Sequence, residues 1–341
     1  MKLEPITRIT PPSASTGVST TPDGRVFLVL ARIDGSDGPQ VVEAVDDTFV
    51  PYPDGDWNTA SPDVEAAERF VRINAQRIGP DGALWLVDVG APGFGNAPLP
   101  GGPKLVKVDV TSNQVARTYP LAAFTEGKSF IDDVRFHGNR AYLTDAGAGA
   151  IIVLDLETGS GRRLLAGHES TTAQRPMTAE GSTLLADREP VYIHADQLEV
   201  SPDGSTLYFQ PCTGPLYRVP TRLLDDDSTT EEEIAAAVEL FASTGSTGGT
   251  AISADGTIYL SDTDASTILA VAPDGTVTVI AESSALSWVD AMWLDANGDL
   301  WLPAAQLHRM SPFNNGTSKV REPVEIFTIP VGTTPPPTDH R

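Results

Sequence analysis

The segment Leu198-Glu199-Val200-Ser201-Pro202-Asp203-Gly204-Ser205-Thr206-Leu207-Tyr208-Phe209 reveals the architecture of this chain. A tight-turn tripeptide separates two runs of alternating polarity, which is the strongest short-range signal for a β-hairpin. The chain repeats this arrangement six times along its length. The six tripeptides are Pro22-Asp23-Gly24, Pro80-Asp81-Gly82, His137-Gly138-Asn139, Pro202-Asp203-Gly204, Ala254-Asp255-Gly256 and Ala296-Asn297-Gly298.

Six hairpins spaced roughly 42 to 65 residues apart indicate a repeat fold. We therefore expect an all-β protein, a single six-bladed β-propeller over residues 1–332. The strands within residues 3–9 and 324–329 should lie in the same blade or in adjacent blades, which would close the ring and pair its edges. Residues 333–341 contain three prolines and are expected to form a disordered tail.

Helix signals occur in two places. Residues 230–238 contain a capping box made by Thr230 and Glu233, and this helix is expected on the outer rim as an insertion between blades. A weaker signal covers residues 62–69, with Ser61 as the N-cap. Two long connections, residues 52–72 and 168–194, are expected to lie over the channel mouth, because long loops in compact folds are usually functional or disordered.

The chain of 341 residues is strongly acidic, with 23 Lys and Arg against 46 Asp and Glu and a formal net charge of −23. Nucleic acids and anionic membranes require clustered basic residues, so neither is expected as a partner. We interpret the acidity as a means of solubility, with a focused negative potential that attracts cations as the alternative. A monomer is expected, because the blades pair their own strand edges.

Cysteine usage and hydropathy exclude further kinds of site and of protein. Cys212 stands alone, which excludes an internal disulfide and a cysteine cluster for zinc or an iron–sulfur centre. Residues 1–5 show no apolar signal segment, and no run approaches the ~18 apolar residues of a membrane span. These features predict a cytoplasmic protein, or a secreted one whose signal peptide was removed.

The residue that opens each innermost strand is a candidate for function, because these residues surround the axis of a propeller. Counting back from each turn gives six positions, here called the mouth ring: Thr16, Asn74, Asp132, Asp196, Gly248 and Asp290. Like charges brought together raise one another's pKa unless a cation intervenes. The three aspartates therefore indicate a divalent metal ion, a ligand ammonium group or a shared proton. Oxygen ligands favour Ca²⁺ or Mg²⁺, and no organic cofactor is expected.

Residues next to the mouth ring have both a functional and a structural interpretation. His194 is a candidate general base or nitrogen ligand, and equally a hydrogen-bonded wall residue. The aromatic residues that flank the ring are expected to line a substrate pocket or to pack between blades; they are Trp57, Phe130, Tyr192 and Trp288. Ring aspartates can also bond the N–H groups of their own loops. Four further aspartates are interpreted as structural, namely Asp88, Asp133, Asp145 and Asp262.

Several segments resemble the major royal jelly protein/yellow family. They include residues 196–209 with 216–221, residues 103–109, Asp133-Val134-Arg135, and Gln306-Leu307-His308-Arg309-Met310-Ser311-Pro312-Phe313-Asn314. The resemblance runs from Thr16 to Val331. It implies a six-bladed propeller related to the gluconolactonase and senescence-marker group. For function, it implies pigment-pathway proteins, some of them dopachrome-converting, and binders of small amines or sterols.

The related lactonases hold one divalent ion with an acidic residue opening blade one, an Asn opening blade four and an Asp opening blade five. The matching positions here are Thr16, Asp196 and Gly248, so Thr16 and Gly248 supply no carboxylate. The substrate-contacting Asn of lactonase blade three corresponds to Asp132. A metal ion in this chain would therefore have to shift toward Asp132, Asp196 and Asp290.

These observations predict a small-molecule enzyme with its site at the channel mouth, a lactonase-like hydrolase or an isomerase of a carbonyl or lactone substrate. Asp132 or Asp196 would be the general base, His194 would shuttle the proton, and Asn74 would contact the substrate. A divalent ion, where bound, would polarise the carbonyl. The alternative is a non-catalytic binder of a small cationic or aromatic ligand. A protein-interaction propeller ranks last, because the chain lacks the WD pattern.

Overall fold

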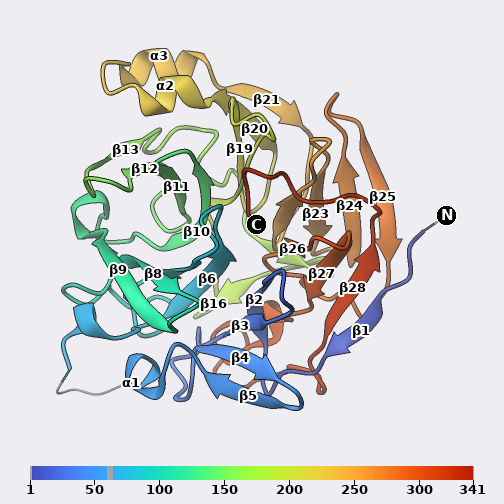
Figure 1. Ribbon diagram of the computed structural model, residues 1–341. Coiled ribbons are helices and arrows are strands. Elements are labelled where there is room, and N and C mark those ends of the chain that lie inside the picture. Colours follow the sequence, from blue (N-terminus) through green and yellow to red (C-terminus); the bar gives the residue numbers. More distant parts are fainter. Residues whose placement is uncertain (1, 60–63, 341) are drawn as a thin grey trace.

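Six four-stranded sheets stand around one central channel and form a six-bladed β-propeller (Figure 1). The computed structural model describes residues 2–59 and 64–340. In the first five blades the antiparallel strands follow one another along the chain, so each is a meander. The first strand of each blade lies innermost, against the first strands of its neighbours. The predicted fold class is confirmed.

Each of the first five blades runs from its innermost strand outward. Blade one contains β2 (Ser15–Thr20), β3 (Val26–Leu30), β4 (Val41–Val45) and β5 (Thr48–Pro51). Blade two contains β6 (Ile73–Ile78), β7 (Leu84–Asp88), β8 (Lys104–Asp109) and β9 (Gln114–Pro120). Blade three contains β10 (Ile131–His137), β11 (Arg140–Asp145), β12 (Ala150–Asp155) and β13 (Gly161–Leu164). Blade four contains β18 (Ala195–Val200), β19 (Thr206–Pro211), β20 (Leu216–Pro220) and β21 (Glu239–Ala242). Blade five contains β22 (Thr250–Ile252), β23 (Ile258–Asp262), β24 (Thr267–Val271) and β25 (Val277–Glu282).

Blade six closes the ring by joining the two ends of the chain. Its strands are β26 (Trp293–Leu294), β27 (Asp299–Pro303), β28 (Ile326–Pro330) and, outermost, β1 (Ile6–Ile9). Ile6 of β1 pairs with Thr328 of β28 in an antiparallel register. The predicted closure is thus confirmed, and the N-terminal strand covers an edge that would otherwise be open to other chains.

The inner turns and the interblade core explain why these segments fold as they do. Asp203 accepts hydrogen bonds from Ser201 Oγ at 2.6 Å and Ser205 N at 3.0 Å, and Gly204 supplies the positive φ of 73° that the turn requires. The strands after the turns bury their apolar side chains between blades, as Leu28 and Leu84 do between blades one and two. Full burial of such a side chain stabilises the fold by about 1.5–3 kcal/mol relative to exposure.

The described helices are short and lie outside the blades or between their strands. They are α1 (Gly55–Asn58), α2 (Thr221–Asp225) and α3 (Glu231–Ala236), with 3₁₀ turns at Ala66–Glu68, Ala122–Phe124, Leu307–Arg309 and Ser311–Phe313. The capping box of α3 is present, because Thr230 Oγ1 accepts from Glu233 N while Glu233 Oε2 accepts from Thr230 N. Helices α2 and α3 lie on the outer rim, as predicted for residues 230–238 (Figure 1), but they are inserted between β20 and β21, within blade four, and not between two blades. None of the described helices has the length and apolar composition needed to cross a membrane.

The two long connections differ from each other. Residues 168–194 form two short hairpins, β14 (Thr178–Ala179) with β15 (Ser182–Thr183), and β16 (Leu185–Ala186) with β17 (Glu189–Pro190). Strands of two residues are too short to leave a periodic signal in the sequence. In the connection 52–72, α1 lies at the outer edge of the ring (Figure 1). The helix predicted over 62–69 lies partly in residues 60–63, outside the described residues, and Ala66–Glu68 form a 3₁₀ turn instead.

The C-terminal tail departs from the predicted disorder. It crosses the inner turns of blades five and four, where Thr334 O accepts from Ala254 N at 2.8 Å and Thr338 Oγ1 donates to Pro202 O at 3.2 Å. It ends at the centre of the ring (Figure 1), where Asp339 and His340 are only 8% and 7% exposed. The proline-rich composition of the tail predicts disorder. Its order is not visible in the sequence, because the partners of Asp339 and His340 lie far away along the chain.

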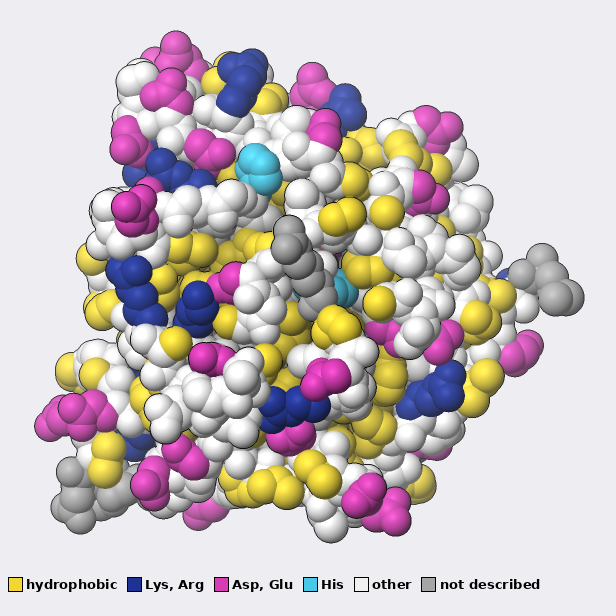
Figure 2. Space-filling view, viewed as in Figure 1, with side chains coloured by type: hydrophobic (Ala, Val, Ile, Leu, Met, Phe, Trp, Pro, Cys, Tyr) yellow, Lys and Arg dark blue, Asp and Glu magenta, His cyan; other side chains and the backbone are white. Residues whose placement is uncertain are grey.

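The charged side chains on this face are dispersed. Figure 2 shows acidic groups scattered among basic and polar ones over the whole face, without a single dominant patch. This distribution agrees with the interpretation of the net charge as a means of solubility.

Candidate functional site at the channel mouth

An irregularity in the innermost strands aims the mouth ring into the channel. In each of the first four blades the pairing of the first and second strands shifts register at the ring position, around Thr16, Asn74, Asp132 and Asp196. Such β-bulges bend a strand and redirect a side chain, and they are frequent next to binding sites. The recurrence of one bulge in four blades turns four side chains toward the same axis.

Blades five and six reach the ring by close backbone approach. A Cβ atom at Gly249 would stand 2.3 Å from the carbonyl oxygen of Asp290, and one at Gly248 would stand 2.2 Å from that of Val289. Both glycines are therefore required for the backbone of blade six to pass against blade five. The absence of a side chain at Gly248 leaves this side of the ring without a polar group.

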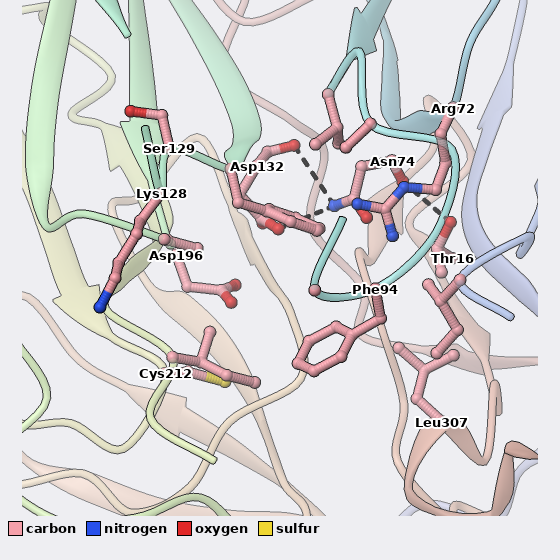
Figure 3. A pocket seen from close by; sticks show the side chains of 18 of the residues that line it. Thr16, Arg72, Asn74, Phe94, Lys128, Ser129, Asp132, Asp196, Cys212 and Leu307 are labelled. Atoms are coloured by element: carbon pink, nitrogen blue, oxygen red, sulfur yellow. Dashed lines mark hydrogen bonds between the residues drawn. The ribbon is translucent and has the colours of Figure 1, made fainter. Parts of the chain in front are cut away.

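All six mouth-ring residues line one cavity of about 460 Å³, a size suited to a small organic ligand. Thr16 Oγ1 donates to Asn74 O at 2.8 Å, and Asn74 Nδ2 donates to Asp132 Oδ1 at 2.7 Å, which links blades one, two and three (Figure 3). The outer wall is apolar and includes Ile33, Val89, Phe94, Leu307 and Phe313.

Asp132 and Asp196 line this cavity close enough for the charge of one to act on the other. Burial and the neighbouring charge of Asp196 raise the pKa of Asp132 well above its usual range. Burial raises the pKa of Asp196 to about 7. The pair can therefore hold or release a proton near neutral pH.

Asp290 completes the group of carboxylates from the side of blade six. Its oxygens accept hydrogen bonds from Ala291 N at 3.0 Å and Trp288 Nε1 at 3.1 Å. Burial raises the pKa of Asp290 well above its usual range, while the Ala291 and Trp288 donors stabilise the charged form. Cys212 also lines the cavity, but its thiol donates to Thr247 O at 2.9 Å, and burial raises its pKa, so it is not a reactive thiolate.

The donor set at the mouth does not match a preformed divalent metal site. Among residues 2–59 and 64–340, no group of three His, Cys, Asp or Glu side chains has the spacing to hold a metal ion. Oxygens of all three ring aspartates accept hydrogen bonds from protein donors, which for Asp196 include Gln197 Nε2 at 2.7 Å. A metal bound by Asp132, Asp196 and Asp290 would need these side chains to move.

The flanking aromatic residues divide into two groups. Phe130, Tyr192 and Trp288 line the cavity, as the sequence predicts. Trp57 does not, because its ring packs 5.1 Å from that of Phe70 at the edge of the core between blades one and two. Trp57 lies in a helix at the outer edge of the ring, and its distance from the axis is not visible in the sequence.

His194 also lies outside the cavity lining. Its Nδ1 accepts a hydrogen bond from Ala173 N at 3.0 Å, which fastens the start of the 168–194 connection. Burial lowers its pKa, so the ring stays neutral at pH 7 and serves as the hydrogen-bonded wall residue of the structural interpretation. The neighbouring Ile193 and Tyr192 turn toward the cavity in its place.

Several cavity residues were not predicted from the sequence, and the charged residue Arg72 is among them. It precedes Asn74 by two positions, the same offset at which Phe130 precedes Asp132 and Trp288 precedes Asp290. The signal was therefore present in the sequence, since three of the residues at this offset line the cavity. In Figure 3, Arg72 and Thr16 lie on one side of the pocket and Asp196 with Lys128 on the other.

The remaining aspartates are structural, as predicted. Asp88 accepts from Val71 N and Arg72 N, and Asp145 accepts from Phe130 N, so the two hold equivalent segments in blades two and three. Asp133 accepts from Arg135 Nη1 at 2.7 Å, away from the ring. Asp262 accepts from the N–H groups of its own turn, at residues 264 and 265.

Solved structures share this architecture at low sequence identity. A gluconolactonase from Xanthomonas campestris matches with a TM-score of 0.59 and 12% identity, covering 97% of this chain and 91% of that protein. A putative gluconolactonase matches with a TM-score of 0.61 and 11% identity, over 98% and 93% of the two chains. Virginiamycin B lyase from Staphylococcus aureus matches with a TM-score of 0.53 and 12% identity, over 96% and 99%. At such identities the likeness establishes the fold alone.

Sequence comparison assigns the chain to a protein family, which structural similarity at such low identity cannot do. None of the curated proteins matches this chain. The model of the family described as "Major royal jelly protein" matches residues 75–325, from the first strand of blade two to the last connection of blade six. The chain therefore belongs to the major royal jelly protein family.

Proposed function

We propose that the protein is a small-molecule enzyme that carries out acid–base chemistry on a carbonyl compound or lactone at the channel mouth. The observation that carries this proposal is the placement of two carboxyl groups with raised pKa, Asp132 and Asp196, in one cavity that has an apolar outer wall. Two neighbouring carboxyl groups, one protonated and one ionised, can act as acid and base in the same step.

The chemistry follows from the two protonation states of the pair. The protonated member donates a hydrogen bond to the carbonyl oxygen of the substrate, which draws electrons toward that oxygen. The ionised member removes a proton from the carbon next to the carbonyl, or from a water that attacks a lactone carbonyl. The first path gives isomerisation and the second hydrolysis, and Asn74 keeps Asp132 oriented in both.

Solvent deuterium exchange tests the proposal across whole classes of candidate substrates. Panels of small ketones, hydroxy-ketones and γ- and δ-lactones are incubated with the protein in D₂O and followed by NMR. We expect exchange next to a carbonyl or opening of a lactone, with a loss of about 10²–10⁴-fold in Asp196→Asn. Asp274→Asn, at an exposed turn of blade five, is the matched control and should retain full activity. No turnover across the panels, or turnover unchanged in Asp196→Asn, would overturn the proposal.

A non-catalytic binder of a cationic or aromatic ligand is the second candidate. It is favoured by Asp290 beside Trp288 and by Phe130 in the same cavity, an arrangement that suits an ammonium group against aromatic faces. The two candidates differ in pH dependence. An ammonium ligand would bind more weakly as pH falls below about 7, because Asp196 then becomes neutral. Binding of phenethylamine without any turnover would favour this candidate.

A further inference from the structure

Arg72 is a buried cation at the mouth whose side chain the proposed acid–base step does not use. Asp88 fixes its backbone by accepting from Arg72 N at 2.9 Å, just before the strand β6 begins. Its side chain is only 1% exposed and lines the cavity. The guanidinium lies over the ring of Phe130, with 4.7 Å between its central carbon and the ring centroid.

The guanidinium lacks a polar partner within the described residues. Its Nε and Nη1 atoms are buried and make no hydrogen bond there. Burial lowers the pKa of Arg72 to about 10, so the group stays protonated at neutral pH. A buried charge without a partner is costly, and protein interiors almost always supply one.

The two carboxylates whose charges act on Arg72 already accept hydrogen bonds from other donors. Asp88 accepts from three backbone N–H groups and from Lys104 Nζ at 2.6 Å. Asp132 accepts from Asn74 Nδ2 at 2.7 Å. The partner that Arg72 lacks is therefore not supplied by the described residues around it.

Other buried cations of the fold do not share this condition. Lys104 pairs with Asp88 at 2.6 Å, Arg135 pairs with Glu199 at 2.7 Å, and Arg77 pairs with Asp339 at 2.5 Å. Arg72 differs from these three in lining the cavity, where a ligand has access to its N–H groups.

We propose that the pocket takes a small organic acid and that Arg72 binds its carboxylate. The apolar body of the acid would lie against Phe94 and Phe130, and its far end would reach the Asp132–Asp196 pair. A guanidinium recognises a carboxylate through two parallel N–H···O bonds, a geometry that neither an amide nor an amine reproduces. The inference rests on the proposed function and deepens it, because it names the substrate class for the same cavity.

Three probes with one framework test this assignment by binding alone. 3-Phenylpropionate, 3-phenylpropionamide and 3-phenylpropylamine present an anion, a neutral group and a cation on the same aromatic body. Titration calorimetry or ligand-observed NMR at pH 7 should give an affinity about tenfold or more higher for the carboxylate than for the amide. Arg72→Met should remove this preference, and Arg72→Lys should keep part of it.

Lys319→Met is the matched control, because Lys319 is exposed and does not line the cavity. It should keep the carboxylate preference within about threefold, since exposed charges contribute little. The inference is overturned if the amide or amine binds as well as the carboxylate, or if Arg72→Met leaves the preference unchanged. It is also overturned if the carboxylate Kd exceeds about 10 mM. Absent turnover in the deuterium experiment would defeat the proposed enzyme while leaving carboxylate binding, measured separately, intact.

Discussion

Charged side chains at the mouth ring lack oppositely charged partners, whereas those of a second ring deeper in the channel are paired. The second ring, here called the lower ring, lies three positions further along the inner strands and contains Arg77, Arg135, Glu199 and Trp293. There Arg135 bonds both Asp133 and Glu199, Arg77 bonds Asp339 of the tail, and His340 stacks on Trp293 at 3.8 Å. At the mouth, burial raises the pKa of the three aspartates, and Arg72 has no partner among the described residues.

Whether a charged side chain has an oppositely charged partner distinguishes structural residues from candidate site residues better than residue type does. Acidic and arginine side chains occur at both levels, since Arg72 lies beside the mouth ring and Glu199 lies in the lower ring, so composition cannot assign them. In the lower ring each charge is neutralised by a partner from another blade or from the tail, which locks the blades together. At the mouth the charges remain uncompensated and border a cavity, which is the condition expected of a binding or catalytic site.

The strongest test of the contrast compares two arginines. Arg135→Met leaves Asp133 and Glu199 buried without their cation and should destabilise the fold by about 3–5 kcal/mol. Arg72→Met removes a buried charge that has no partner among the described residues, so the free energy of unfolding should stay the same or rise. Urea denaturation of both variants measures the difference. Equal destabilisation by the two substitutions would show that Arg72 is as well compensated as Arg135.

The tail provides a second, smaller test. Asp339→Asn weakens the bonds to Arg77 and His340 and should cost about 1.5–3 kcal/mol at pH 7. Burial raises the pKa of Asp339, but the attraction and hydrogen bonds of Arg77 and His340 together lower it below its usual range. Its contribution is therefore present above the unfolded pKa of about 3.9 and is lost as pH falls below it. Thermal melts should therefore differ between variant and wild type at pH 7 and converge in acid. A constant difference at all pH values would contradict the ion pair.

The fold was predictable because its signal is local and repeated. The six turn tripeptides and the alternating runs around them specify hairpins within about a dozen residues, and repetition specifies the ring. The tail was not predictable in this way. Asp339 and His340 acquire order from Arg77 and Trp293, which lie 262 and 47 positions earlier and become neighbours only once the ring has closed.

The location of the site could be predicted from the sequence, but not all of the residues that line it. Counting to the start of each inner strand finds the mouth ring, because the bulge recurs at the same place in four blades. The same offset that marks Phe130 and Trp288 also marks Arg72, yet it marks His194 as well, which turns to Ala173 instead. Tyr192 and Ile193 line the cavity in place of His194, and the sequence carries no local sign of this difference.

The pH dependence of stability gives a third test, centred on Asp196. Its pKa is raised to about 7 by burial, above about 3.9 in the unfolded chain, so the folded state binds the proton more tightly. Stability is therefore lost as pH rises between these values. Asp196→Asn should stabilise the fold by about 1–2 kcal/mol at pH 8 and have little effect near pH 4. Equal destabilisation at both pH values would indicate that Asp196 is a structural turn-former.

The smallest expected effect is the response to divalent cations. A Ca²⁺ site with a Kd of about 10 μM would raise the stability by about 2.7 kcal/mol at 1 mM Ca²⁺. We expect Ca²⁺, Mg²⁺ and EDTA to leave the Tm unmoved, because oxygens of all three ring aspartates already accept hydrogen bonds from protein donors. A Tm that rises with Ca²⁺ in wild type but not in Asp290→Asn would mean that a cation neutralises the mouth ring. The two rings would then be alike, each with its charges compensated, and the pKa values of Asp132 and Asp196 would no longer be raised.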